Sequence, residues 1–240
     1  PIDPIRERLV MTTAVPLGWQ RNLMDETPDH AKLVRLSNPI LFDHELEKLR
    51  DLGDDFASRT LDITWLAQEG EAGLEAAIER ISRQAEAAAR DGVRILILSD
   101  RRTDHDRSPI PALLAVGAVH HHLNRVDLRM WLSIVVDTGE VRDPHSAATM
   151  FGFGAQAICP WLAFQTIREM VEHDPKEKLE GLKWEKAASN YRSALEKGVL
   201  KIMSKMGISV LSSYQGAQIF EAVGLSSEIV DRCFSGTPSQ

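Results

Sequence analysis

The sequence predicts an α/β protein whose parallel sheet forms a partial or incomplete (β/α) barrel, with flanking helices and a helical C-terminal extension. Two observations predict this class. In the middle of the chain, short apolar runs alternate with longer segments whose apolar residues recur at helical spacing, which is the pattern of successive strand–helix units. Towards the end, the strand-like runs stop and only helical spacing remains. We therefore divide the chain into an irregular N-terminal wrap at 1–65, an α/β core at 66–175 and a helical extension at 176–240.

The N-terminal segment lacks a sustained period, because proline and glycine residues interrupt it. Two elements stand out within it. Residues 43–50 predict a short helix, with Asp43 at its start and leucines on one face. Residues 60–65 alternate in polarity and are rich in β-branched side chains, so they predict a strand.

The core has the clearest periodicity. Leu74, Ile78 and Ile81 lie at helical spacing, and Asp91-Gly92 ends that helix before a buried apolar strand. Prolines open two later helices, because a first-turn residue needs no N–H donor. The predicted elements are a helix at 73–90, a strand at 93–98, a polar loop at 99–108, a helix at 109–124, a strand at 130–136, a helix at 144–150, a strand at 155–158 and a helix at 160–173. This alternation predicts a parallel sheet with right-handed crossovers.

The extension predicts only helices. Tyr191, Leu195 and Val199 form one apolar stripe, and Gly207 ends the helix that carries it. We expect these helices to pack as a lid or as an extension on the sheet. Its predicted helices span 189–206, 213–223 and 228–234.

Composition narrows the range of functions. The 240 residues carry 28 Lys and Arg against 35 Asp and Glu, a net charge of −7, which disfavours nucleic acid as a partner. No apolar run approaches the roughly 18 residues of a membrane span. Cys159 and Cys233 are too far apart for a Cys-x-x-Cys site, and an iron–sulfur cluster needs about four cysteines. Because the chain starts with Pro1 rather than Met, we expect it to be part of a longer protein.

The run His120–His122 is the first candidate for chemistry. Consecutive residues on a helix point about 100° apart, so these three rings do not ligate one ion together. We expect them to form hydrogen bonds to loops or to a neighbouring domain. A metal-binding module that uses His105, this run or His145 stays open as an alternative.

A second candidate is the loop Ser99–Arg107, which follows a buried strand. Ligands of α/β folds bind at the carboxyl edge of the sheet, and this loop holds acids, bases and a histidine. The alternative is a solvated loop with internal ion pairs of little net value. If the loop binds a ligand, the chain is a free-standing small-ligand or metal-binding α/β protein.

A third candidate is the glycine-containing region 137–158. A strand ending in Asp137-Thr-Gly139, followed by a helix and a second strand, is typical of phosphate sites in flavin-binding barrels. Here Gly139 stands alone and Glu140 would repel a phosphate. We therefore expect tight helix–strand packing in this region. Under this interpretation the chain has no catalytic, cofactor-binding or metal-binding residue.

Several stretches resemble the central domain of the large (alpha) chain in the glutamate synthase family, whose members use ferredoxin or NADPH. They follow the family's order along nearly the whole chain, and the resemblance is specific. The matching stretches are 1–7, 96–101, 110–123, 201–207 and 213–222. The family makes L-glutamate from L-glutamine and 2-oxoglutarate.

The resemblance implies the domains that flank this one. A glutaminase domain precedes it, and a flavin mononucleotide (FMN) barrel with a 3Fe-4S cluster follows it. FMN and the cluster belong to the parent enzyme and not to this fragment. The chain would then be a scaffold that joins the two catalytic domains and helps to form the ammonia channel, with no complete active site of its own.

Further expectations follow from this role. We expect Thr60, Thr64, Ser99, Asp100 and His121 to lie near a channel or an interface, the first four because they lie at strand ends. The partners would be the glutaminase and FMN-binding domains, without nucleic acid or membrane. Self-association of the excised chain is also expected where an interdomain surface is exposed. The implied location is the cytoplasm, or the plastid stroma for a photosynthetic eukaryote.

Overall fold

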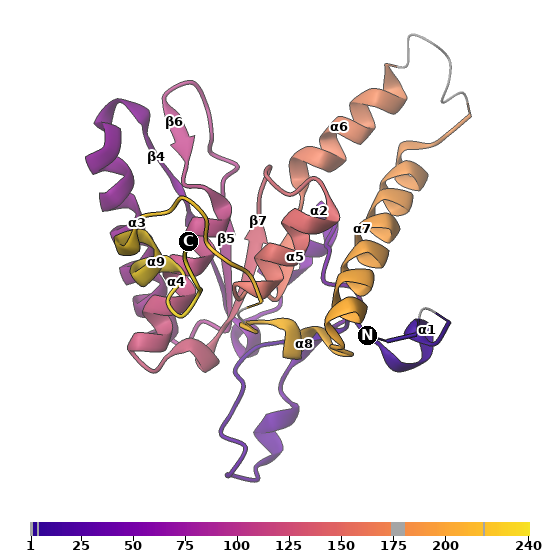
Figure 1. Cartoon of the computed structure of the whole chain (residues 1–240), viewed down its shortest axis with the longest axis horizontal. Coiled ribbons are helices and arrows are strands. Elements are labelled where there is room, and N and C mark those ends of the chain that lie inside the picture. Colours follow the sequence, from indigo (N-terminus) through magenta and orange to yellow (C-terminus); the bar gives the residue numbers. More distant parts are fainter. Residues whose placement is uncertain (1, 4, 174–180, 218) are drawn as a thin grey trace.

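The structure is a computed structural model that describes residues 2–3, 5–173, 181–217 and 219–240. At its centre lies a parallel four-stranded sheet in the order β3–β5–β7–β8 (Figure 1). Its strands are β3 (Ser58–Asp62), β5 (Ile95–Ser99), β7 (Ser133–Asp137) and β8 (Ala157–Cys159). The order of the strands in the sheet is the same as their order along the chain, as in a (β/α) barrel. The sheet has two edge strands, β3 and β8, so it does not close into a barrel. The predicted class is confirmed.

Helices connect the strands and cover the sheet. The helix α3 packs on α4, α4 packs on α9, and both α5 and α6 pack on α7. Figure 1 shows α6 and α7 diverging from the sheet on one side, while α3, α4 and α9 lie together on the other side. The long helices are α3 (Gly70–Arg90), α4 (Ala112–Arg125), α5 (Pro144–Gly152), α6 (Trp161–Glu172) and α7 (Trp184–Met206), and the short ones are α1 (Glu7–Val10), α2 (Asp43–Arg50), α8 (Leu211–Tyr214) and α9 (Ser227–Cys233).

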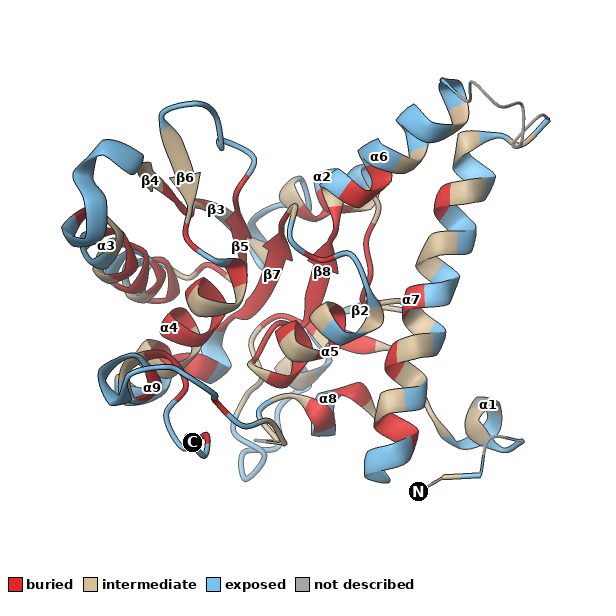
Figure 2. Cartoon of the chain, turned by 45° about the horizontal axis from the view of Figure 1, so that its top comes forward, coloured by how far each residue is buried: buried red, intermediate tan, exposed pale blue. Residues whose placement is uncertain are grey.

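The core centres on the two middle strands. Every residue of β5 and β7 is buried, because each strand has neighbours on both sides and helices over the sheet (Figure 2). This double coverage explains why both sequences are almost purely aliphatic. The helix α3 contributes its apolar stripe, with Ile81, Ala85 and Ala88 fully buried.

The N-terminal segment is more ordered than predicted. It contains an antiparallel pair, β1 (Val15–Leu17) and β2 (Val34–Leu36), and it supplies β3 to the central sheet. The division of the chain at 65 and 175 stays a prediction, and the second boundary lies outside the described residues.

Two element predictions are corrected. The predicted strand 60–65 is two strands, because the chain leaves the central sheet at Ile63 and β4 (Thr64–Leu66) pairs with β6 (Arg107–Pro109). The predicted helix 213–223 is wrong in its described part. One turn, α8, is followed by Gln215 in an extended conformation and by Gly216 at φ +70°, a left-handed conformation that stops a helix.

The structure also gives a finding on membranes. Across the described parts of the chain, each helix is too short or too polar to cross a bilayer.

Candidate functional site

The four strands of the sheet end in one row. Asp62 pairs with Ser99, Ser99 with Asp137, and Asp137 with Cys159. Residues paired in this way point to the same face of a parallel sheet. The carboxyl edge therefore carries a continuous polar row, and this is the edge at which α/β folds bind ligands.

Asp137 is the centre of this row, and its side chain is fully buried. Ser99 Oγ donates to its Oδ2 at 2.8 Å, and Arg101 Nε donates to both carboxylate oxygens at 2.8 and 2.9 Å. The guanidinium of Arg50 lies 3.6 Å from the same carboxylate. Burial lowers the pKa of Arg101, but Asp137 and Asp43 outweigh it, so that the pKa rises. The buried charge is thus compensated by two arginines.

Asp100 lies next to the row, and its carboxylate accepts three hydrogen bonds. Its Oδ2 accepts from Thr138 Oγ1 at 2.6 Å and from the Gly139 N–H at 2.9 Å, and its Oδ1 accepts from Trp161 Nε1 at 2.6 Å. The residue is only 3% exposed. A carboxylate held by three donors ties β5, β7 and α6 together rather than acting as an acid or base.

At this edge, carboxylates of the chain accept from backbone N–H groups of a helix start and of a glycine. A helix N-terminus and glycine N–H groups bind phosphate in flavin barrels. Here the Gly139 N–H donates to Asp100, and the Ala112 N–H, at the start of α4, donates to Glu140 Oε2 at 2.9 Å. Burial raises the pKa of Glu140, and the charge of Asp100 raises it further against the Ala112 hydrogen bond. These residues do not fit the phosphate of FMN.

Cys159 ends the row on the far strand. It is fully buried, and its thiol lies 3.6 Å from Asp43 Oδ1. Burial raises the pKa of this thiol, and the nearby charges of Asp137 and Asp43 raise it further, although Arg101 opposes them. A thiol held in its protonated form is a poor nucleophile.

The edge of β3 carries a second network. Thr64 is fully buried, and its Oγ1 donates to Asp62 Oδ1 at 2.6 Å and accepts from Arg107 Nε at 2.8 Å. Burial raises the pKa of Asp62, but the Thr64 hydrogen bonds and the cations Arg107 and Arg102 lower it on balance. Thr60 lies one row back on the same strand and is exposed.

Three of the five predicted positions, Thr64, Ser99 and Asp100, lie at or beside the carboxyl ends of β3 and β5. Thr60 does not lie at a strand end as predicted, because it is the middle residue of β3 and pairs with Ile97. His121 lies elsewhere. It belongs to the second half of α4, and its ring lines a cavity with Gly152 and Phe153. The helix α4 starts at the carboxyl edge, so its second half approaches the opposite edge.

The Ser99–Arg107 loop is divided between the two networks. Arg101 belongs to the Asp137 network, and Arg107 belongs to the Asp62 network. His105, at its tip, is exposed and lies 3.1 Å from Asp106. Within the described residues, no group of three His, Cys, Asp or Glu side chains is arranged to hold a metal ion.

Sequence reasoning missed several members of this site. Arg50 and Asp43 come from α2 and Trp161 comes from α6, two helices outside the strands, and nothing in their local sequence marks them as members of this site. A signal did exist for the strand ends, because three aliphatic runs each end in a polar residue or cysteine at Ser99, Asp137 and Cys159. Aligning these ends required the register of the sheet.

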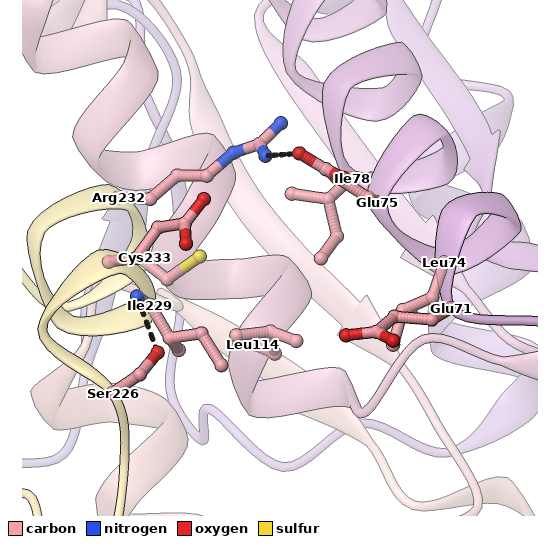
Figure 3. Close-up of a pocket in the computed structure, with 10 residues that line it drawn as sticks. Glu71, Leu74, Glu75, Ile78, Leu114, Ser226, Ile229, Arg232 and Cys233 are labelled. Atoms are coloured by element: carbon pink, nitrogen blue, oxygen red, sulfur yellow. Dashed lines mark hydrogen bonds and ion pairs between the residues drawn. The ribbon is translucent and has the colours of Figure 1, made fainter.

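A further cavity, of about 240 Å³, lies between α3, α4 and α9 (Figure 3). Arg232 spans it to Glu75 at 3.7 Å, and burial raises the pKa of Cys233 to about 11. Its apolar lining consists of Leu74, Ile78, Leu114 and Ile229. This is a packing gap beside an ion pair, and it lacks an activated nucleophile.

The fold and the edge define a class: a (β/α)-barrel-like domain whose ligand edge is closed by its own side chains. The family model described as the glutamate synthase central domain matches residues 1–226. The chain belongs to this family, as the sequence resemblance predicted.

Known relatives agree with this assignment. The chain is 40% identical to the NADH glutamate synthase of Schizosaccharomyces pombe, 42% to the ferredoxin-dependent glutamate synthase of Pyropia yezoensis and 40% to the NADPH glutamate synthase large chain of Bacillus subtilis. Each match covers 100% of this chain but only 11%, 16% and 15% of the relative. The chain thus spans a small part of the relatives that it matches.

Solved structures with similar folds are more distant. The flavin-binding domain of baker's yeast flavocytochrome b2 is similar at a TM-score of 0.46 and 15% identity, over 74% of this chain and 37% of that one.

Proposed function

We propose that this chain is the connecting domain of a glutamate synthase that makes L-glutamate from L-glutamine and 2-oxoglutarate. It would hold the glutaminase domain and the FMN-binding domain with its 3Fe-4S cluster in fixed positions, and would form part of the ammonia channel between them. The isolated chain would be inactive.

One observation carries this proposal. The two N–H groups that would bind a phosphate at the sheet edge, those of Gly139 and Ala112, donate instead to Asp100 and Glu140. Side chains that form hydrogen bonds to these backbone groups hold the loops in place and leave no N–H donor for a ligand. A rigid connecting domain fits the need to keep water away from ammonia in transit.

The predicted positions take different parts in this proposal. Thr64, Ser99 and Asp100 are buried and hydrogen-bonded, so they would shape the edge from within. Thr60 is exposed on the outermost strand, so it would face the channel or the neighbouring domain. His121 would belong to a different interface, at the other end of α4.

The proposed location is the cytoplasm, or the plastid stroma if the parent comes from a photosynthetic eukaryote. The rice relative, for example, is named as chloroplastic. The excised chain would self-associate where it meets other domains in the parent. Ile5, Leu9, Leu23 and Met24 are more than four-fifths exposed, and they are candidates for such surfaces.

The experiment uses the full-length enzyme that contains this chain, with Thr60→Lys and, as a matched control, Thr166→Lys on the exposed face of α6. Glutamate formation is measured with glutamine and, separately, with ammonium as the nitrogen source. We expect Thr60→Lys to lower the glutamine-dependent rate about tenfold or more, because a bulky charged side chain there would shift the neighbouring domain or the channel wall from its working position. The ammonium-dependent rate should stay unchanged. Thr166→Lys leaves both rates unchanged.

Equal rates for Thr60→Lys and the wild type with glutamine would remove Thr60 from the channel. A separate assay tests the role of the whole domain. Glutamate formation from glutamine and 2-oxoglutarate by the isolated chain would contradict the connecting role itself.

A further inference from the structure

The side chain of Arg129 is a buried cation without a carboxylate. The residue is 8% exposed, and it makes no ion pair in the described part of the chain. Its donors reach only neutral acceptors: Nε donates to His120 Nδ1 at 2.9 Å, and Nη1 donates to the Leu132 carbonyl at 3.0 Å. Nη2 donates to the Gly154 carbonyl at 2.8 Å and to Gln156 Oε1 at 3.3 Å. A buried charge in a folded protein is normally paired with an opposite charge. The fold thus holds an uncompensated positive charge near the amino ends of β7 and β8.

This cation fixes the state of His120. Because Nδ1 accepts the Arg129 hydrogen bond, the proton of the neutral ring lies on Nε2. Burial lowers the pKa of His120 to about 3, with a further contribution from the Arg129 charge, so the ring stays neutral. The Nε2–H group, on the far side of the ring, has no partner among the described residues. Polarisation by Arg129 makes it a stronger donor.

The backbone supports this contact at one glycine. Gly154 has φ +116°, and a Cβ atom built there would lie 2.3 Å from His120 Nδ1. Only glycine lets Arg129 and His120 meet at this place.

His120 opens onto a cavity of about 270 Å³, in which neither Asp nor Glu lines the wall. The cavity lies between α4, the end of α5 and the segment that follows α9. Its lining residues are His120, His121, Asn124, Gly152, Phe153, Gly216, Ser235 and Thr237. Burial and the charge of Arg125 both lower the pKa of His121, so a second cation lies near this wall. Two cations, Arg129 and Arg125, thus lie near a wall whose side chains are neutral and can form hydrogen bonds.

We propose that this cavity binds a small oxyanion, a free carboxylate or inorganic phosphate. The anion accepts from the His120 Nε2–H and the Asn124 side-chain amide, and Arg129 supplies the opposite charge through the ring. The site lies at the opposite edge of the sheet from the Asp137 network, and it does not depend on the proposed connecting role.

The test is NMR of the chain labelled with ¹⁵N-histidine, titrated with sodium acetate and, separately, with inorganic phosphate at constant ionic strength. We expect His120 in the Nε2–H form, and a downfield shift of this proton that saturates with at least one of the two anions. A response to acetate alone assigns a carboxylate, and a response to phosphate alone assigns phosphate.

Variants are compared by calorimetry with the anion that binds. Asn124→Ala removes the side-chain amide, a neutral hydrogen-bond donor to the charged anion. We therefore expect the affinity for the anion to fall about tenfold. Asn124 is exposed, so the change should not disturb the core. The matched control is His122→Ala on the same helix, because His122 pairs with Glu86 at 2.9 Å and does not line the cavity. Its affinity stays that of the wild type.

Three results would overturn the proposal: His120 in the Nδ1–H form, no saturable shift with either anion, or unchanged affinity in Asn124→Ala.

Discussion

At the scale of single residues, the carboxyl edge depends on how its buried acids are compensated. Asp137 and Asp100 are both buried, but one is balanced by arginines and the other by neutral donors. Glu140 has one backbone donor and lies near Asp100, so its charge is the least compensated of the three. These differences lead to opposite expectations for their removal.

Asp137→Ala should lower the free energy of unfolding by about 3–5 kcal/mol, because it leaves Arg101 and Arg50 facing each other without their shared carboxylate. The measurement is urea unfolding followed by circular dichroism. The control is Asp91→Ala, which breaks an exposed pair with Arg59 and should cost no more than about 1 kcal/mol. If both variants lose the same small amount, Asp137 does not hold the edge together.

Glu140→Gln should stabilise the protein at neutral pH and not at acid pH. A carboxyl whose pKa is raised on folding binds more protons in the native state, so stability falls as pH rises from the ordinary Glu value through the raised one. Glutamine removes this charge and keeps an acceptor for the Ala112 N–H. Thermal unfolding between pH 4 and pH 7 measures the difference.

The control for this profile is Glu71→Gln, an exposed position on α3. Its melting temperature should follow the wild type at every pH. A Glu140→Gln protein that is less stable than the wild type at pH 7 would mean that the charged form is favoured in the fold.

At the scale of elements, close backbone contacts decide how the helices pack. A Cβ atom at Gly117 on α4 would lie 2.2 Å from the carbonyl oxygen of Cys233, at the end of α9. The glycine therefore allows α9 to lie directly on α4. It also explains why a residue that weakens helices is found inside α4.

Gly117→Ala should destabilise the protein by about 1–3 kcal/mol, because the new methyl group forces α9 away from α4. Helix propensity alone predicts the opposite, a gain of about 1 kcal/mol. Chemical unfolding measures the sign. In the control Asn190→Ala, on the exposed surface of α7, only propensity changes, so its stability should rise slightly. A stabilised Gly117→Ala protein would show that α9 adapts without cost.

The sequence predicted those elements whose pattern is local. The strands β5 and β7 are continuous aliphatic runs because they are buried on both faces, and the stripe of α3 is equally regular. The predicted helix after 213 failed because Gly216 takes a left-handed conformation, which apolar spacing does not reveal. The site was predicted only where residues follow strands. The approach of Arg50 and Trp161 to that edge depends on tertiary packing.

At the scale of the whole molecule, the sheet has two edges with different chemistry. The carboxyl edge is closed by compensated acids and arginines, whereas the opposite side has the cavity beside His120 and the buried charge of Arg129. The family relatives are much longer than this chain, which covers 11–16% of their length.

We propose that the carboxyl edge is a structural closure and not a flavin site. The most direct measurement adds excess FMN to the purified chain, removes free flavin by desalting and records the absorbance spectrum of the protein. We predict no retained flavin absorbance, because Asp100 and Glu140 already occupy the N–H groups that a phosphate needs. Retention of one FMN per chain would contradict this account and would make the 137–158 region a working phosphate site.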